Sequence, residues 1–162
     1  MFPTPPLVEI VESPGATTAV IAEETTWDAF PGLWRALLDE VWAFVRAASL
    51  EAGRNVMLYK DDRPNVEVGV EVAGAFDSDG RVVASALPAG RAARTLSRGA
   101  PSAETIARAH ATVIGWCEAN GVVLDRWRWE LYGHWADEQD PDEYEIEVYW
   151  RLRDQQSSPA GL

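Results

Sequence analysis

The stretch Val66-Glu67-Val68-Gly69-Val70-Glu71-Val72 alternates strictly between valine and other residues. Successive side chains of a β-strand point to opposite faces, so this spacing predicts a strand whose four valines share one face. Turn-forming residues 61–65 separate it from the largely apolar residues 55–60, which predict a neighbouring strand. Residues 27–45 carry apolar side chains every three or four positions, which indicates a long helix with Asp28 as its cap. Gly53 and Asn55 are expected to end this helix.

The elements on either side of this segment repeat in a fixed order. Residues 8–12 alternate and end at residues 13–15 (Ser-Pro-Gly), which predicts a strand followed by a turn, and residues 17–22 predict a continuing edge strand. The first half therefore has the order strand, helix, strand, strand. The second half repeats it, with strands at 81–86 and 92–96 joined by a turn at 87–90 (Leu-Pro-Ala-Gly). A helix opens at 101–102 and closes at 120–121, and strands follow at 127–135 and 144–152.

This repeat predicts an α+β fold made of two pseudo-symmetric strand–helix–strand–strand units, about 7–76 and 81–153. Each unit has one helix to cover one sheet face, so the units should join into one antiparallel sheet with two long helices. A pseudo-twofold axis between them would leave a central ligand cleft. We expect a single domain over residues 1–153 and a disordered tail over the polar residues 154–162.

The composition excludes several classes of protein. The 162 residues include 14 basic and 26 acidic side chains, a formal net charge of −12, whereas phosphate binding needs clustered Lys and Arg. One cysteine (Cys117) and two histidines (His110 and His134) argue against a disulfide or a metal centre, and no cofactor is expected. Apolar runs stay below the roughly 18 residues of a membrane span, and the N-terminus lacks signal-peptide features. We expect a cytoplasmic protein that binds neither nucleic acid nor membrane.

Much of the negative charge lies in one short segment. Residues 137–147 hold seven acidic side chains among eleven positions, with no basic residue between them. The simplest interpretation is a solvated loop that leads into a strand. Two alternatives stay open: a rim that attracts cations to a neighbouring pocket, or a surface for a basic protein partner.

Several segments in order resemble those of GyrI-like small-molecule-binding domains. The resemblance spans roughly residues 7–153 and is carried by residues 66–72, 87–93, 98–101, 129–133 and 147–150. This domain is the effector-binding part of many AraC-type and MerR-type transcription factors, where it binds drug-like, often cationic and aromatic molecules. The resemblance implies a stand-alone member without a DNA-binding domain. Some stand-alone members sequester toxins or drugs, and others hydrolyse cyclopropane-containing natural products.

One carboxylate is the strongest candidate for a functional group. Glu130 lies mid-strand between Trp129 and Leu131, and the resemblance places the family's pocket glutamate at this position. A carboxylate among aromatic rings is poorly solvated, so it can bind a cation by charge or act as a general acid or base. If it is buried and unpaired, glutamine in its place should stabilise the empty protein. The alternative is a glutamate that faces water.

Aromatic residues are candidates for the walls of the same site. Tyr132 shares the strand face of Glu130 by alternation, and ring faces attract cations and stack on flat ligands. The predicted ligand-binding set is Glu130, Tyr132, Tyr149, Tyr59 and Trp42. Core packing is the alternative for each aromatic member. His110 is expected to be a partly exposed surface residue, and His134 to lie near a hairpin tip.

These residues favour a protein that binds drug-like aromatic molecules, cations among them, in a multidrug-sensing or sequestering role. An alternative uses the same pocket for hydrolysis of cyclopropane-containing compounds. Glu130 would then activate a water molecule, and the hydroxyl of Tyr132 would stabilise the charge on the leaving group. A third hypothesis is a protein-interaction module that acts through residues 137–147.

Overall fold

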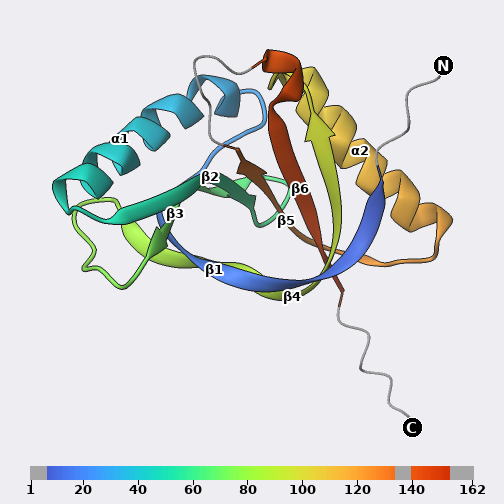
Figure 1. Cartoon of the computed structure of the whole chain (residues 1–162), viewed down its shortest axis with the longest axis horizontal. Coiled ribbons are helices and arrows are strands. Elements are labelled where there is room, and N and C mark those ends of the chain that lie inside the picture. The colour runs from blue at the N-terminus through green and yellow to red at the C-terminus, as the bar shows by residue number, and fades with distance from the viewer. Residues whose placement is uncertain (1–6, 134–139, 154–162) are drawn as a thin grey trace, which may run out of the picture.

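The computed structural model describes residues 7–133 and 140–153 (Figure 1). His134, residues 137–139 of the acidic segment and the tail 154–162 lie outside the described residues. The elements are β1 (Val8–Glu24), η1 (Phe30–Gly32), α1 (Trp34–Ala47), β2 (Glu51–Tyr59), β3 (Asn65–Ala73), β4 (Val83–Arg98), α2 (Ala103–Ala119), β5 (Leu124–Tyr132), η2 (Pro141–Glu143) and β6 (Glu145–Leu152).

The strands form one antiparallel sheet that closes into a barrel in the order β1-β3-β2-β5-β6-β4. Helix α1 packs on β3 and β1, and helix α2 packs on β4 and β6, so each helix covers the outside of its own half (Figure 1). The predicted α+β class, with two helices on one antiparallel sheet, is confirmed. Closure is the feature that the sequence did not predict, and it removes the edge expected at residues 17–22.

The strand order has the internal symmetry that the repeat predicts. If β1, β2 and β3 correspond to β4, β5 and β6, then reading the barrel from either end gives the same order. Two strand pairs, β1 with β4 and β2 with β5, join a strand to its own counterpart, as strands beside a twofold axis do. Within the second pair Met57 lies opposite Glu130, so this carboxylate sits at the centre of the molecule.

Three hydrophobic clusters hold the fold together. The four alternating valines of β3 are all buried in the first cluster, beneath α1, as their spacing predicted. A second cluster lies beneath α2 and includes Val113 and Cys117. The third lines the inner face of the barrel, where Val56, Leu58, Trp129 and Leu131 meet. The residue between two of the valines is Gly69, because a Cβ there would lie 1.9 Å from the carbonyl oxygen of Ala19 on β1.

Two predicted turns are wrong, and for the same reason. Residues 13–15 and 87–90 do not end strands but lie within the long strands β1 and β4. They lie opposite each other, with Ser13 paired to Gly90, and the hydroxyl of Ser13 donates to the carbonyl of Pro88 at 2.9 Å. Turn-forming residues that face one another across two strands produce a shared bend instead of two hairpins.

The first helix also differs from the prediction, whereas the second agrees. Helix α1 begins at Trp34, after the short η1 turn, and Trp27 lies outside it. Residues 53–55 belong to β2 instead of ending the helix. In α2, the side chain of Ser102 accepts from the Thr105 N–H at 3.1 Å, as expected of a cap. Among the described residues, no helix is long and apolar enough to cross a membrane.

Candidate functional site: a buried carboxylate among neutral donors

Glu130 lies on the outer face of β5, beneath the helices, and is 1% exposed. Its position is fixed by the register of three strands, with Met57 of β2 on one side and Val148 of β6 on the other. Because a buried carboxylate without partners is very costly, the contacts of its two oxygens decide the chemistry of the site. Both oxygens are occupied.

Two tyrosines donate to the same carboxylate oxygen. The hydroxyl of Tyr132 lies 2.6 Å from Oε1 of Glu130, and that of Tyr59 lies 3.1 Å from it. Tyr59 is two residues after Met57 and Tyr132 two residues after Glu130, so the pair follows the internal symmetry of the fold. Burial first, and then the charge of Glu130, raise the pKa of both tyrosines well above the usual value of 10.0. Both hydroxyls therefore keep their protons and act as donors.

A histidine from the same repeat contacts the second oxygen. Nε2 of His110, on α2, lies 2.6 Å from Oε2 of Glu130, and the indole N–H of Trp150 points to Nδ1 at 2.9 Å. Since a second N–H on the ring would face the N–H of Trp150, the single imidazole proton lies on Nε2 and is donated to Glu130. His110 is therefore neutral and Glu130 is ionised.

Glu130 is thus buried but not unpaired, which corrects one expectation from the sequence. Three neutral donors satisfy its lone pairs, so glutamine in its place loses partners instead of removing a penalty. Among the described residues, no buried side-chain nitrogen or oxygen lacks a hydrogen-bond partner. The donors leave the negative charge of the site in place, because each of them is a neutral group.

An arginine two positions before Glu130 lies inside a cage of aromatic rings. The guanidinium of Arg128 lies 4.9 Å from the ring centre of Trp150, 5.5 Å from that of Trp27 and 6.0 Å from that of Tyr59. The residue is 7% exposed, and its guanidinium pairs with Asp62 at 2.9 Å and donates to the carbonyl of Arg126 at 2.9 Å. The cage and the carboxylate share Tyr59, so they belong to one site.

The structure brings together three of the five predicted site residues. Tyr59 and Tyr132 both contact Glu130. Trp42 instead donates its indole N–H to Asn55 at 2.9 Å, on the strand position opposite Tyr132. The placement of Tyr149 in this site is wrong. It pairs with Trp129 in the register of β5 and β6, so it points to the inner face of the barrel and stacks on the Trp129 ring at 5.1 Å.

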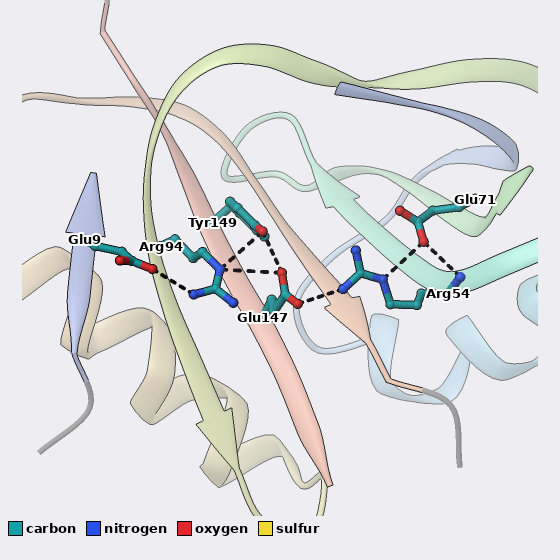
Figure 2. Close-up of polar contacts among 6 residues, drawn as sticks. All are labelled: Glu9, Arg54, Glu71, Arg94, Glu147 and Tyr149. Carbon is teal, nitrogen blue, oxygen red and sulfur yellow. Dashed lines mark hydrogen bonds and ion pairs between the residues drawn. The ribbon is translucent and has the colours of Figure 1, made fainter. Parts of the chain in front are cut away.

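Tyr149 belongs to a separate charged network on the inner face (Figure 2). Its hydroxyl donates to Glu147 at 2.6 Å, and Glu147 also accepts from Arg54 at 2.7 Å and pairs with Arg94 at 3.5 Å. Figure 2 shows that the contacts continue from Arg94 to Glu9, 3.0 Å away, and from Arg54 to Glu71. Burial opposes ionisation of Glu147, but Tyr149 and the two arginines outweigh it and lower its pKa.

Four residues of the site were not predicted from the sequence. His110 was expected at the surface, yet it is four residues after Ile106 and three before Val113, so helical spacing already placed it on the buried face. Alternation from Glu130 places Arg128 on the same strand face. Trp150 and Trp27 gave no comparable signal, because their positions depend on strand register and on the loop before η1.

Where the central cleft was expected, these side chains pack around Glu130 and leave it 1% exposed. Open cavities occur elsewhere: one of about 310 Å³ beside Lys60 and Glu67, and one of about 600 Å³ beside Arg91 and Arg151. Across residues 7–133 and 140–153, no three His, Cys, Asp or Glu side chains are arranged to hold a metal ion. A ligand at Glu130 therefore has to displace side chains that now occupy the centre.

The sequence matches no protein-family model and no curated protein at a significant level. Its fold matches several solved structures. The C-terminal domain of EcmrR has a TM-score of 0.76 at 18% identity, over 93% of this chain and 99% of that domain. In the EcmrR–DNA complex the match covers 57% of the EcmrR chain.

Two further solved structures have the same fold at lower identity. SAV2435 bound to tetraphenylphosphonium has a TM-score of 0.62 at 12% identity, over 95% of this chain and 97% of that one. A hydrolase from Listeria innocua has a TM-score of 0.59 at 9% identity, over 90% and 91% of the two chains. These TM-scores establish a shared fold at low identity, in agreement with the fold that the resemblance to GyrI-like domains predicted.

Proposed function

We propose that this protein binds small aromatic organic cations at Glu130. One observation carries the proposal: a carboxylate that is 1% exposed accepts hydrogen bonds from three neutral donors and is surrounded by aromatic rings. Neutral donors satisfy the lone pairs of the carboxylate without cancelling its charge. In surroundings of low polarity that charge attracts a cation more strongly than a surface carboxylate does.

Structures of the same fold support this proposal. SAV2435 was solved with tetraphenylphosphonium, a cation whose charge is covered by four phenyl rings and which donates no hydrogen bond. Such a ligand is recognised by charge and by ring contacts, and the Glu130 site offers both. Recognition by charge and ring faces tolerates varied shapes, so we place the protein in a multidrug-sensing or sequestering role.

Partner binding through the acidic segment 137–147 stays a separate and weaker prediction. Two of its acidic residues already have partners within the chain, because Glu145 pairs with Arg98 at 3.0 Å and Glu147 with Arg54 at 2.7 Å. A basic protein would therefore have to bind the remaining acidic residues of the segment.

Titration with tetraphenylphosphonium tests the function directly. We expect saturable quenching of tryptophan fluorescence with micromolar affinity, roughly −8 kcal/mol of binding free energy. Glu130→Gln should weaken this binding at least about tenfold, because it removes the charge that pairs with the cation. The affinity for triphenylphosphine oxide, a neutral analogue, should fall much less in the same variant.

Glu147→Gln is the matched control, since it removes a carboxylate from the neighbouring strand on the opposite face. It should leave the affinity for tetraphenylphosphonium unchanged. Absence of binding across a panel of aromatic cations, or equal losses in the two variants, would contradict the proposal.

Hydrolysis is the second candidate, and the short contact between Tyr132 and Glu130 favours it. Glu130 would take a proton from a water molecule as that water attacks a strained ring, and Tyr132 would stabilise the charge on the leaving group. His110 does not serve as the base in the arrangement described, because both of its ring nitrogens are engaged. Retained substrate binding with lost turnover in Glu130→Gln would separate this candidate from simple binding.

A further inference from the structure

The aromatic cage beside Glu130 already holds a cation. The rings around Arg128 come from three separate parts of the chain: Trp27 before η1, Tyr59 at the end of β2, and Trp150 on β6. Aromatic rings attract cations through their faces, and weakly hydrated planar cations such as guanidinium suit them best. The cage is therefore built for the class of ligand proposed above, and the chain fills it with its own side chain.

We infer that Arg128 is a built-in competitor of the ligand, and that the ligands are delocalised organic cations that replace its guanidinium in the cage. This inference rests on the proposed function. Two cations a few ångströms apart repel each other in a buried site, so an external cation and Arg128 cannot occupy the cage together. Arg128 thereby sets the affinity and selectivity of the site: weakly bound cations fail to displace it.

Two of the residues that hold Arg128 in the cage are exposed to solvent. Its carboxylate partner, Asp62, has a side chain that is 84% exposed, and ion pairs of this kind contribute little to stability. The same residue accepts the indole N–H of Trp27 on its carbonyl oxygen at 3.0 Å. Trp27 is itself 46% exposed. Release of the Asp62 carboxylate removes the ion pair and leaves the guanidinium with its bond to the carbonyl of Arg126. The ring of Trp27 moves separately, by giving up its bond to the carbonyl oxygen of Asp62.

Hydrogen bonds of the neighbouring residue Asp61 fix the conformation of the loop that carries Asp62. The carboxylate of Asp61 accepts from the backbone N–H of Arg63 at 3.0 Å and from that of Asn65 at 2.8 Å. A further bond from the Asn65 amide and these two backbone bonds lower the pKa of Asp61 to about 2. The loop thus keeps its shape, and the opening step is confined to the side chain of Arg128 and the ring of Trp27.

Chemical replacement of the missing guanidinium tests the cage without any drug-like ligand. In Arg128→Ala, millimolar methylguanidinium should raise the melting temperature in a saturable way, because it fills the vacated cage. Methylurea, a neutral molecule of similar shape, should not, and the wild-type protein should respond to neither. Equal responses to the two compounds, or equal responses of variant and wild type, would overturn the inference.

The affinity for tetraphenylphosphonium gives the second readout. If the wild-type cage is open about a tenth of the time, Arg128→Met should bind this cation about tenfold more tightly. Arg54→Met, which removes an arginine of the inner-face network, should not change the affinity. Unchanged or weaker binding by Arg128→Met overturns the inference even where the wild type binds.

The two proposals fail in different ways. Absence of tetraphenylphosphonium binding in both wild type and Arg128→Met contradicts the proposed function, while the methylguanidinium experiment still decides the cage. Should both Arg128 variants fail to fold, Asp62→Asn removes the ion pair and leaves the packing of Arg128 in place. It should tighten cation binding a few-fold, and unchanged affinity would overturn the inference.

Discussion

Glu130 and Glu147 lie on neighbouring strands, but their carboxylates have different kinds of partner. Glu130 faces the helices and accepts from two tyrosines and a neutral histidine. Glu147 faces the inside of the barrel and is paired with Arg54 and Arg94. Both carboxylates are satisfied as hydrogen-bond acceptors. Only Glu147 is neutralised by cations in direct contact.

This difference separates a structural carboxylate from one that is available for binding. Arginine pairs cancel the charge of Glu147, and its network joins five strands of the barrel (Figure 2). The neutral donors around Glu130 hold the carboxylate in place and leave its charge for a cation to meet. Arg128, two residues before Glu130 on the same strand face, lies in the aromatic cage and pairs with Asp62.

Truncation of each carboxylate should give the largest contrast in stability. Glu130→Ala leaves three buried donors without an acceptor and opens a cavity, so we expect a loss of about 3 kcal/mol or more. Glu147→Ala should cost about 1 kcal/mol, because its arginines are partly exposed and keep other carboxylates, Glu71 and Glu9. Urea unfolding of the two variants measures both values, and similar losses would contradict the comparison.

Glu130→Gln should also destabilise the empty protein, by about 1 to 2 kcal/mol at neutral pH. Its amide group would present an N–H to a group that also donates, either His110 or the pair of tyrosines. The sequence alone predicted the opposite sign, on the premise of an unpaired carboxylate. A melting temperature of Glu130→Gln above that of the wild type would restore that premise.

The reversed sign predicted for Glu130→Gln shows which features of the site can be predicted from the sequence and which cannot. Alternation correctly placed Tyr132 on the face of Glu130, and period-two valines correctly predicted β3. Tyr149 was misplaced because its face depends on the register of two strands joined by a long segment. A shift of one residue moves every side chain to the other face. Local patterns do not contain that information.

Donor geometry is equally hidden from the sequence. The hydrogen bond of His110 to Glu130 joins a helix and a strand 20 positions apart, and the Trp150 bond that fixes its tautomer joins residues 40 apart. Turn signals failed for a related reason, because residues 13–15 and 87–90 are matched across the barrel. Each segment alone is a plausible hairpin turn, and only their pairing makes them a bend.

The tyrosines should make the stability of the protein fall at alkaline pH. Their pKa is raised in the folded state, so their contribution is complete below the unfolded value of about 10 and is lost as pH rises toward the folded value. Tyr132→Phe should cost about 1 kcal/mol near neutral pH and reduce the loss seen on moving to about pH 11. Tyr149→Phe should change the alkaline loss less, because Arg94 opposes the rise in the pKa of Tyr149. Urea unfolding at both pH values compares the variants.

The smallest effect is expected at acid pH, from Glu147. Burial acts against its ionisation, yet Tyr149, Arg54 and Arg94 lower its pKa, so the ionised form is favoured in the folded state. Its contribution is present above the unfolded value of about 4.3 and is lost as pH falls through the lowered folded value. Because the network is partly exposed, we expect only roughly 0.5 kcal/mol.

Glu147→Gln isolates this contribution. The stability difference between wild type and variant should shrink as pH falls from neutral toward about 3, and molar salt at neutral pH should shrink it too. Glu130→Gln is the matched comparison at neutral pH, because neutral donors give salt no ion pair to screen. Its difference from wild type should therefore resist salt. A salt-sensitive Glu130 difference would mean that a cation of the chain already neutralises this carboxylate, and the contrast between the two glutamates would then disappear.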